Sequence, residues 1–448
     1  MLKHRPQTQS SLEFVCIDEL VPKDHLLRKV DKHIDFSFIH ELVKDLYCQN
    51  NGRPALDPTL MFKLLLLGYL FGVRSERQLI REVEVNVAYR WFLGLGLTDK
   101  IPDASTLSQN RRRRFNDSDV YQQIFDQIVL QAMRKKLVSG HVLYTDSTHI
   151  KASANKNKHL QVIVKQERQA YMDQLDCAVE EERISHGKKA LSAPPSKAPS
   201  EKTIKQSTTD PDSGYMVRDQ KPKGFFYLDH RTVDGKANII TDVHITAGNV
   251  HDSVPYIGRL ERQQKRFGFN IKAVGLDAGY NSAAICKQLE DKQIFAAIAY
   301  RRLNHKAGMF YKREFEYDAE NNHYTCPEGQ TLIYKTTSRE GYHHYQSDGS
   351  HCQGCPSLKR CNNNAEHVKT ITRHVWQDSK ERTTEKRLSV YGQAIYKRRK
   401  ETVERSFADA KELNGYRYAR FRGRNKVQAQ ALLTAAAQNM KKIALMAA

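Results

Sequence analysis

Hydrophobic side chains recur at helical spacing through the first third of the chain. One row consists of Leu60, Leu64, Leu67 and Phe71, and a second consists of Leu79, Val83 and Val87. Residues three and four apart share one face of an α-helix, so each row predicts an amphipathic helix with one buried side. The pattern runs from about residue 14 to residue 136. We therefore expect an all-helical domain over residues 1–138.

After residue 139 the pattern changes to short apolar runs that alternate with helical segments. The turn Asp234-Gly235 between two of these runs is typical of a β-hairpin, and Ser282 is a good N-cap for a helix between the last two. Strands that alternate with helices predict an α/β core over residues 139–302. The expected strands are 142–150, 225–233, 238–245, 271–277 and 294–300, with a helix at 253–266.

Two insertions interrupt this core. Residues 158–223 are strongly charged: the part up to residue 187 has a helical pattern, and the remainder is rich in Lys, Ser, Pro and Thr. That composition predicts an extended, partly flexible segment. Residues 303–390 form a second insertion, which contains clustered cysteines. Residues 391–448 return to the core with two expected helices, 396–413 and 426–446.

The net charge of +21 is unevenly distributed. Residues 396–426 contain eleven basic and four acidic residues. Clustered positive charge favours a polyanionic partner, and we expect double-stranded DNA, with a general solubility charge as the alternative. The longest apolar run, residues 64–73, is about half as long as a membrane span, and the first residues lack an apolar signal segment. We expect a cytoplasmic protein with no membrane partner.

A run of four arginines, Arg111, Arg112, Arg113 and Arg114, follows the helix-capping types Ser105 and Thr106. Four consecutive residues cover every face of a helix, and their mutual repulsion needs neutralising anions. We interpret this helix as a DNA contact, and a solvated surface helix is the alternative. The tract that contains Arg417, Arg420 and Arg422 alternates cations with aromatic residues, which suits DNA contact or packing on the core.

Three acidic residues stand out by their positions. Asp146 lies within the strand 142–150, Asp277 ends the strand 271–277, and Glu404 lies on the helix 396–413. A buried carboxylate is costly unless a cation neutralises it, and hard oxygen ligands suit Mg²⁺ or Mn²⁺. These residues predict a metal site for phosphodiester chemistry. Singly, Asp277 could end a strand and Glu404 could pair with arginines on its own helix.

The segments around these acids carry a family resemblance. TDSTHIKASANK, GLDAGYNS and VERSFADAKELNGYRYARFRG resemble the Asp, Asp and Glu motifs of bacterial insertion-sequence transposases of the DDE class. PDASTLSQNRRRRF, ITAGNVHDS and TDPDSGYMVRDQKPKGF are similar to other segments of the insertion-sequence-five and eleven-eighty-two groups. The resemblance implies a ribonuclease-H-like catalytic core with Asp146, Asp277 and Glu404 as its metal-binding and catalytic triad.

The family's last signature is Tyr, Arg, Glu and Lys on one helix. Tyr396, Arg399, Glu404 and Lys411 fit this signature, with one extra residue between Arg399 and Glu404. Glu401 is therefore a rival for the third acidic position. The resemblance implies that Arg399 and Lys411 hold phosphate or neutralise charge near the metal.

The same resemblance implies a function. It predicts a transposase that cleaves the ends of an insertion sequence and joins the 3′ hydroxyls to target DNA, acting as a homo-oligomer on nucleoid DNA. A metal-dependent nuclease and a non-catalytic DNA-binding regulator are the alternatives. The intact acidic triad speaks against the regulator.

Four of the eight cysteines cluster in the second insertion: Cys326, Cys352, Cys355 and Cys361. Four thiolates can close a tetrahedral Zn²⁺ site, and His323 or His351 could replace one of them. Free thiols are the alternative. His251 and Asp252 follow Gly248 and Asn249 in a polar turn, and we assign them no chemistry.

Overall fold

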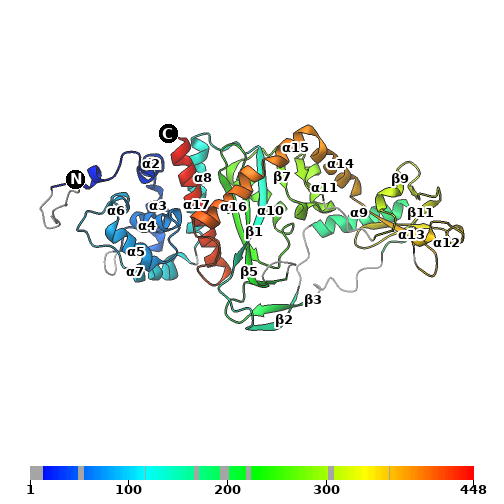
Figure 1. Cartoon of the computed structure of the whole chain (residues 1–448), viewed down its shortest axis with the longest axis horizontal. Coiled ribbons are helices and arrows are strands. Elements are labelled where there is room, and N and C mark those ends of the chain that lie inside the picture. Colours follow the sequence, from blue (N-terminus) through cyan, green and yellow to red (C-terminus); the bar gives the residue numbers. More distant parts are fainter. Residues whose placement is uncertain are drawn as a thin grey trace, which may run out of the picture.

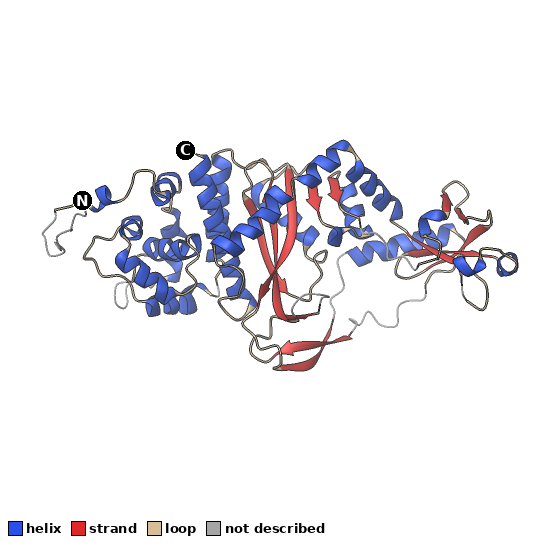
Figure 2. Cartoon of the chain, viewed as in Figure 1, coloured by secondary structure: helices blue, strands red, loops and turns tan. Residues whose placement is uncertain are grey.

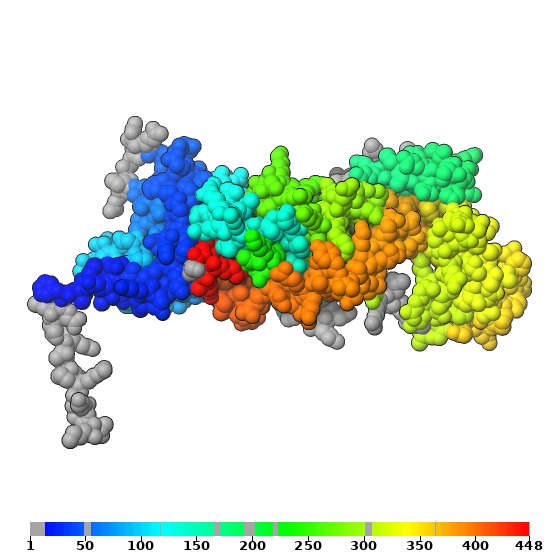
Figure 3. Space-filling model, turned by 90° about the horizontal axis from the view of Figure 1, so that it is seen from above, coloured from blue at the N-terminus to red at the C-terminus, as the bar shows by residue number. Residues whose placement is uncertain are grey.

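The computed structural model describes residues 14–48, 55–116, 118–165, 171–191, 201–217, 223–300, 307–362 and 364–447. The chain is elongated, with helices at its N-terminal end, a mixed sheet in the middle and a small β-rich unit at the far end (Figures 1 and 3). The predicted order of a helical domain followed by an α/β core is confirmed at this level.

The N-terminal part is helical, as predicted. Its largest buried element is α4, which begins after the N-cap Asp57 with Pro58 in its first turn and buries nine residues. Asp103 caps α7, so that helix begins one residue before Ser105. The α-helices are α1 (Ile17–Leu20), α2 (Leu26–His33), α3 (Phe38–Val43), α4 (Pro58–Leu70), α5 (Glu76–Val85), α6 (Val87–Leu93), α7 (Ala104–Asn110) and α8 (Val120–Arg134).

The central sheet is mixed (Figure 2). β5 lies antiparallel to both β1 and β6, whereas β7 lies parallel to both β1 and β8. The resulting order is β6-β5-β1-β7-β8, with the short β4 also paired to β5. The strands are β1 (Val142–Lys151), β4 (Gly214–Met216), β5 (Gly224–Asp234), β6 (Ile240–Ala247), β7 (Ala273–Leu276) and β8 (Phe295–Ile298). All five predicted strands are thus present.

Helices cover this sheet. α10 (Tyr256–Phe267) contacts β6, and α11 (Ala283–Asp291) begins at the predicted cap Ser282. α14 (Gln377–Leu388) and α15 (Val390–Lys397) contact β8. α17 (Arg424–Met446) contacts β6, α2, α4 and α8, so the C-terminal helix joins the sheet to the N-terminal helices.

A buried arginine fixes α16 (Arg405–Leu413) to the sheet. Arg231 on β5 is fully buried and pairs with Asp229 at 2.7 Å. Its guanidinium also donates to Ser406 Oγ on α16 at 2.8 Å and to Gln438 Oε1 on α17 at 2.9 Å. A hydrogen bond to a charged group contributes about 1.5–3 kcal/mol, so the bond from Arg231 to Ser406 holds α16 against β5.

The first insertion differs from the prediction. Residues 159–165 are a strand rather than helix: β2 (His159–Lys165) pairs antiparallel with β3 (Glu201–Ser207), in a segment expected to be extended. Only α9 (Tyr171–Ser185) is helical. The β-branched residues Val162, Ile163 and Val164 favour a strand and outweigh the charged surroundings. The expectation of flexibility falls largely on residues 192–200 and 218–222, outside the described residues.

The second insertion forms its own antiparallel sheet, in the order β13-β12-β11-β10-β9. Its small core consists of Phe315, Tyr324, Leu332, Tyr345 and Ile371. The elements are β9 (Glu316–Asp318), β10 (His323–Thr325), β11 (Thr331–Thr337), β12 (Tyr342–Ser347), β13 (Thr370–His374), α12 (Gly349–Gln353) and α13 (Leu358–Cys361). Across the described parts of the chain, every helix is too short or too polar to span a bilayer.

Candidate active site on the central sheet

The two predicted aspartates lie on neighbouring parallel strands. β1 pairs with β7 in the register Val142 to Ala273, Leu143 to Val274 and Tyr144 to Gly275. Two residues further along the same register, Asp146 on β1 is level with Asp277, which directly follows β7. Strand pairing therefore brings together two residues that are 131 positions apart in sequence, at the point where β7 ends.

Glu404 reaches this site from a helix that crosses it. Arg399 is 5 % exposed in its side chain, and its Nη2 donates to Asp146 Oδ2 at 2.7 Å. The same Nη2 lies 4.0 Å from Glu404 Oε1. Arg399 thus bridges an acid on the sheet and an acid on the helix, which favours Glu404 over Glu401 as the third member of the group.

The helix has a π-helical turn between these two residues. Residues Lys400–Glu404 form a π-helix between α15 and α16, and Glu404 N–H donates to Arg399 C=O at 3.1 Å, five residues back. The predicted continuous helix 396–413 is therefore interrupted. A π turn holds one more residue than an α turn, so the extra residue in the signature is absorbed locally and the faces before and after it stay aligned.

The electrostatics of Asp146 reflect crowding by acids. The pKa of this carboxyl is raised to about 6, mainly because burial desolvates its charged form, and the neighbouring Asp277 and Asp252 contribute to the rise. Arg399 and the backbone N–H of Ser147 act in the opposite direction. One buried guanidinium does not offset the burial of this carboxylate among its acidic neighbours, so a bound cation would be favourable there.

Asp252 is a site residue that the sequence analysis missed. Its Oδ1 accepts a hydrogen bond from Ser147 Oγ at 2.6 Å, next to Asp146 on β1. A Cβ at Gly279 would lie 3.0 Å from Asp277 Oδ1 and 3.6 Å from Asp252 Oδ2, so these carboxylates flank the same glycine. His230, fully buried on β5, has Nδ1 3.8 Å from Asp252 Oδ1.

Lys411 lies on α16, and its Nζ donates to Thr148 Oγ1 at 2.5 Å. Thr148 is two residues after Asp146 on β1, so both side chains lie on the same face of the strand. The predicted Arg399 and Lys411 are thus both brought to the strand that carries Asp146. Each has a contact within the protein.

The four-arginine run is divided by its packing. Residues Arg111–Phe115 form a π-helix, not the expected α-helix. Arg111 pairs with Glu76 and stacks 4.3 Å from the ring of Phe421, and Arg114 lies 4.5 Å from the ring of Tyr47. Arg112 and Arg113 are exposed. Two of the four side chains therefore take part in internal packing, and the exposed pair remains available to DNA.

The tract after α16 is divided in the same way. Arg420 lies 4.3 Å from the ring of Tyr69 in the N-terminal helices. Arg417 and Arg422 are exposed: Arg417 pairs with Glu412, and Arg422 Nε donates to Ser153 C=O at 3.0 Å. One arginine of this tract therefore packs on the protein and two face solvent, and DNA contact by the exposed pair stays a prediction.

The four clustered cysteines line one small cavity of about 30 Å³, together with His351 and His367. Cys326 begins a tight turn in which Gln330 N–H donates to its Sγ at 3.3 Å. Burial raises the pKa of the Cys361 thiol, and charges on the other three cysteines would raise it further. The predicted alternative ligand His323 lies on β10 and is not among the cavity's lining residues.

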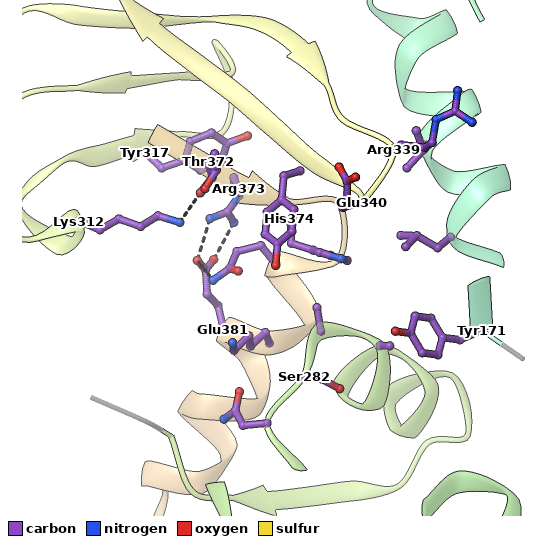
Figure 4. Close-up of a pocket in the computed structure, with 18 of the residues that line it drawn as sticks. Tyr171, Ser282, Lys312, Tyr317, Arg339, Glu340, Thr372, Arg373, His374 and Glu381 are labelled. Carbon is purple, nitrogen blue, oxygen red and sulfur yellow. Dashed lines mark hydrogen bonds and ion pairs between the residues drawn. The ribbon is translucent and has the colours of Figure 1, made fainter. Parts of the chain in front are cut away.

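A much larger cavity lies elsewhere in the described residues. It has a volume of about 1350 Å³ and is lined by α9, α11, α14 and the second insertion (Figure 4). Arg373 is held there by Glu381, and Lys312 donates to Thr372 C=O. It contains none of the predicted catalytic or cysteine residues. Within the described ranges, no group of three or more His, Cys, Asp or Glu side chains is already close enough to hold a metal ion.

Comparisons with known proteins match two stretches of the chain. Residues 15–113 match a family model described as a transposase domain (DUF772), and residues 325–444 match one described as a transposase DDE domain. The second stretch contains Arg399, Glu404 and Lys411. No curated protein matches the chain.

One similar solved structure is the Mos1 mariner paired end complex with Mn, at 11% identity and a TM-score of 0.17. The match covers 56% of this chain and 62% of that one, so the chain spans less than two thirds of its length. A likeness this weak supports no statement about fold or function.

Proposed function

Since this chain belongs to the insertion-sequence transposases of the DDE class, we propose that it cleaves the DNA ends of its element and joins the freed 3′ hydroxyls to target DNA. The observation that carries the proposal is the alignment of Asp146 with Asp277 by strand register, with Glu404 joined to them through Arg399.

The proposed catalytic core is ribonuclease-H-like. Its support is the strand order β6-β5-β1-β7-β8, in which the first three strands are antiparallel and the last two run parallel to β1. In chain order the core strands are β1, β5, β6, β7 and β8. Asp146 lies on the first of them and Asp277 directly follows the fourth, β7, whereas Glu404 lies on a later helix. We also propose the division into a helical domain (1–138), a core (139–302 and 391–448) and an insertion (303–390).

Asp146, Asp277 and Glu404 would hold Mg²⁺ or Mn²⁺. Oxygen donors are the ligands these ions prefer. Burial raises the pKa of Asp146, so a cation beside this carboxylate would be favourable. When bound, such ions activate the attacking oxygen and stabilise the leaving oxygen of a phosphodiester.

The surrounding residues have supporting roles. Arg399 partly neutralises Asp146 and keeps it oriented towards the helix. Lys411 presents a second cation on the same face of β1, where a phosphate would lie. Asp252 holds Ser147, and through it the backbone that bears Asp146.

We further propose that Cys326, Cys352, Cys355 and Cys361 bind a structural Zn²⁺. Their support is the shared cavity and the backbone N–H directed at Cys326 Sγ, a donor that stabilises a thiolate. Among the described residues the insertion core contains only five buried hydrophobic residues, and a metal would compensate for so small a core. The protein would act on DNA in the cytoplasm as a homo-oligomer, because both element ends must be joined to one target.

The test is cutting and joining of a plasmid that carries the gene with its native flanks, in Mg²⁺ or Mn²⁺. We expect joining by the wild type and none by Asp146→Asn or Glu404→Gln, whereas Glu401→Gln should retain activity. Cutting without joining would favour a nuclease, and DNA binding without cutting by the wild type would favour a regulator. If Glu401→Gln abolishes joining and Glu404→Gln does not, Glu401 is the third acid of the site.

A further inference from the structure

A two-stranded ribbon projects from one end of the central sheet. β2 and β3 pair along their full length and lie below β5 (Figure 1). Residues 155–165 and 201–209 together contain five lysines and one glutamate. Lys156, Lys158, Lys202 and Lys205 are all exposed. An isolated two-stranded ribbon is only marginally stable in water, so contacts at its base must hold it.

The base of the ribbon is fixed to the basic tract that precedes α17. The Oδ1 atom of Asp210, just after β3, accepts from Gly423 N–H at 3.0 Å, and Asp212 Oδ2 accepts from Arg424 N–H at 2.9 Å. On the other side, Arg422 donates to Ser153 C=O. The ribbon and the tract are therefore one surface, held at the base by contacts from the residues that precede β2 and those that follow β3.

This surface is strongly cationic. Residues 415–426 contain five basic residues and no acidic residue. The two acids at the base offset only part of this charge: residues 155–165, 201–209 and 415–426 contain ten basic residues against Glu201, Asp210 and Asp212, which leaves +7. Such a concentration of exposed cations attracts a polyanion and repels another basic surface.

The surface also leads to the catalytic strand. The end of β1 pairs with the tract: Lys151 N–H donates to Arg417 C=O at 3.3 Å, and Ala419 N–H donates to Lys151 C=O at 2.9 Å. Asp146 lies five residues earlier on β1, roughly 17 Å away along a strand. That length matches about five base pairs of duplex.

We propose that the β2–β3 ribbon and the tract 415–426 form a duplex-DNA surface, which holds phosphates about five to ten base pairs from the reacting phosphodiester. This rests on the proposed function, because it takes Asp146 as the reaction centre. A two-stranded ribbon fits the major groove. Leu160 and Ile163, exposed by 62% and 63%, lie on opposite faces of the ribbon, so the face turned to the groove would present one of them to base methyl groups.

The test compares the full-length chain with the double variant Lys202→Gln/Lys205→Gln. Its control is Lys335→Gln/Lys359→Gln, exposed lysines of the second insertion. The probes are duplexes of the element end that extend either 4 or 20 base pairs past the cleavage site on each side. On the long duplex, the logarithm of the binding constant falls linearly with the logarithm of the salt concentration. Losing two phosphate contacts should make that slope shallower by about 1.8. Affinity for the short duplex and the melting temperature should stay unchanged.

Equal salt slopes for the ribbon variant and wild type on the long duplex would overturn the proposal. So would a fall in oligomer mass with Leu160→Ser/Ile163→Ser while the lysine variant binds DNA normally, because the ribbon would then contact a second copy. If the ribbon variant loses long-duplex binding but Asp146→Asn still cuts the plasmid, the surface stands and the proposed reaction centre fails.

Discussion

Replacing Asp146 by Asn should stabilise the metal-free protein at alkaline pH. Burial raises the pKa of Asp146 to about 6 from its ordinary value of 3.8, so its ionised form is less favourable in the folded protein than in the unfolded chain. Asn has nearly the same shape and carries no charge. The variant therefore removes an unfavourable charge while it removes the proposed metal ligand.

The magnitude follows from linkage between protonation and folding. A difference of about two pKa units corresponds to about 3 kcal/mol. Because the folded pKa is the higher one, the destabilisation is absent below about pH 4, grows as the pH rises towards 6, and is complete above it. The variant should gain about 3 kcal/mol at pH 8 and almost nothing at pH 3.5.

The assay is urea unfolding in EDTA at both pH values, with Glu404→Gln as the matched control. Glu404 is 46% exposed in its side chain, so its neutralisation should give no comparable gain. Adding Mn²⁺ at pH 8 should stabilise the wild type and leave Asp146→Asn unchanged. A variant no more stable than wild type at pH 8 would refute the account of a buried, poorly compensated carboxylate.

Three further outcomes follow from the geometry. Deleting Lys400 from the π turn should restore an α-helix and preserve plasmid joining, whereas deleting Ala408 should turn the rest of that helix by about 100° and abolish joining. Asp252→Asn should weaken Mn²⁺ binding several-fold in an electron paramagnetic resonance titration, and wild-type affinity would exclude a role for Asp252. Cys355→Ser should lose bound zinc, measured by atomic absorption, and lower the melting temperature, while Cys286→Ser, a buried cysteine outside the cluster, should keep the metal.

Periodicity was sufficient to predict the main elements. The apolar row of α4 and the apolar runs of β1, β5 and β6 are long enough for their spacing to dominate. The row Leu79, Val83 and Val87 was wrongly assigned to one helix, because Asn86 ends α5 and caps α6, which begins at Val87. β2 was assigned wrongly because its seven residues sit among charged ones, and its partner β3 lies more than thirty residues away in sequence. Pairing over that distance leaves no local signal other than three consecutive β-branched residues.

The site was predictable only where its residues lie on strong elements. Asp252 follows a strand in a polar turn, and its role depends on a contact with Ser147, 105 residues earlier. Similarly, nothing in the run of arginines shows that Arg111 pairs with Glu76, 35 residues before it. Such contacts are set by tertiary packing, which local spacing does not report.

The π turn Lys400–Glu404 accommodates the extra residue of the signature and keeps Arg399 and Glu404 close together. One residue more than the signature requires lies between Arg399 and Glu404, and in a continuous α-helix it would rotate Glu404 by about 100° away from the face that carries Arg399. The structure closes that turn with a bond from Glu404 N–H to Arg399 C=O, so both side chains still meet near Asp146. A π turn is rare in proteins, and it is found frequently at functional sites. Its presence beside Asp146 is therefore an argument, independent of motif matching, that the placement of Glu404 is under functional constraint.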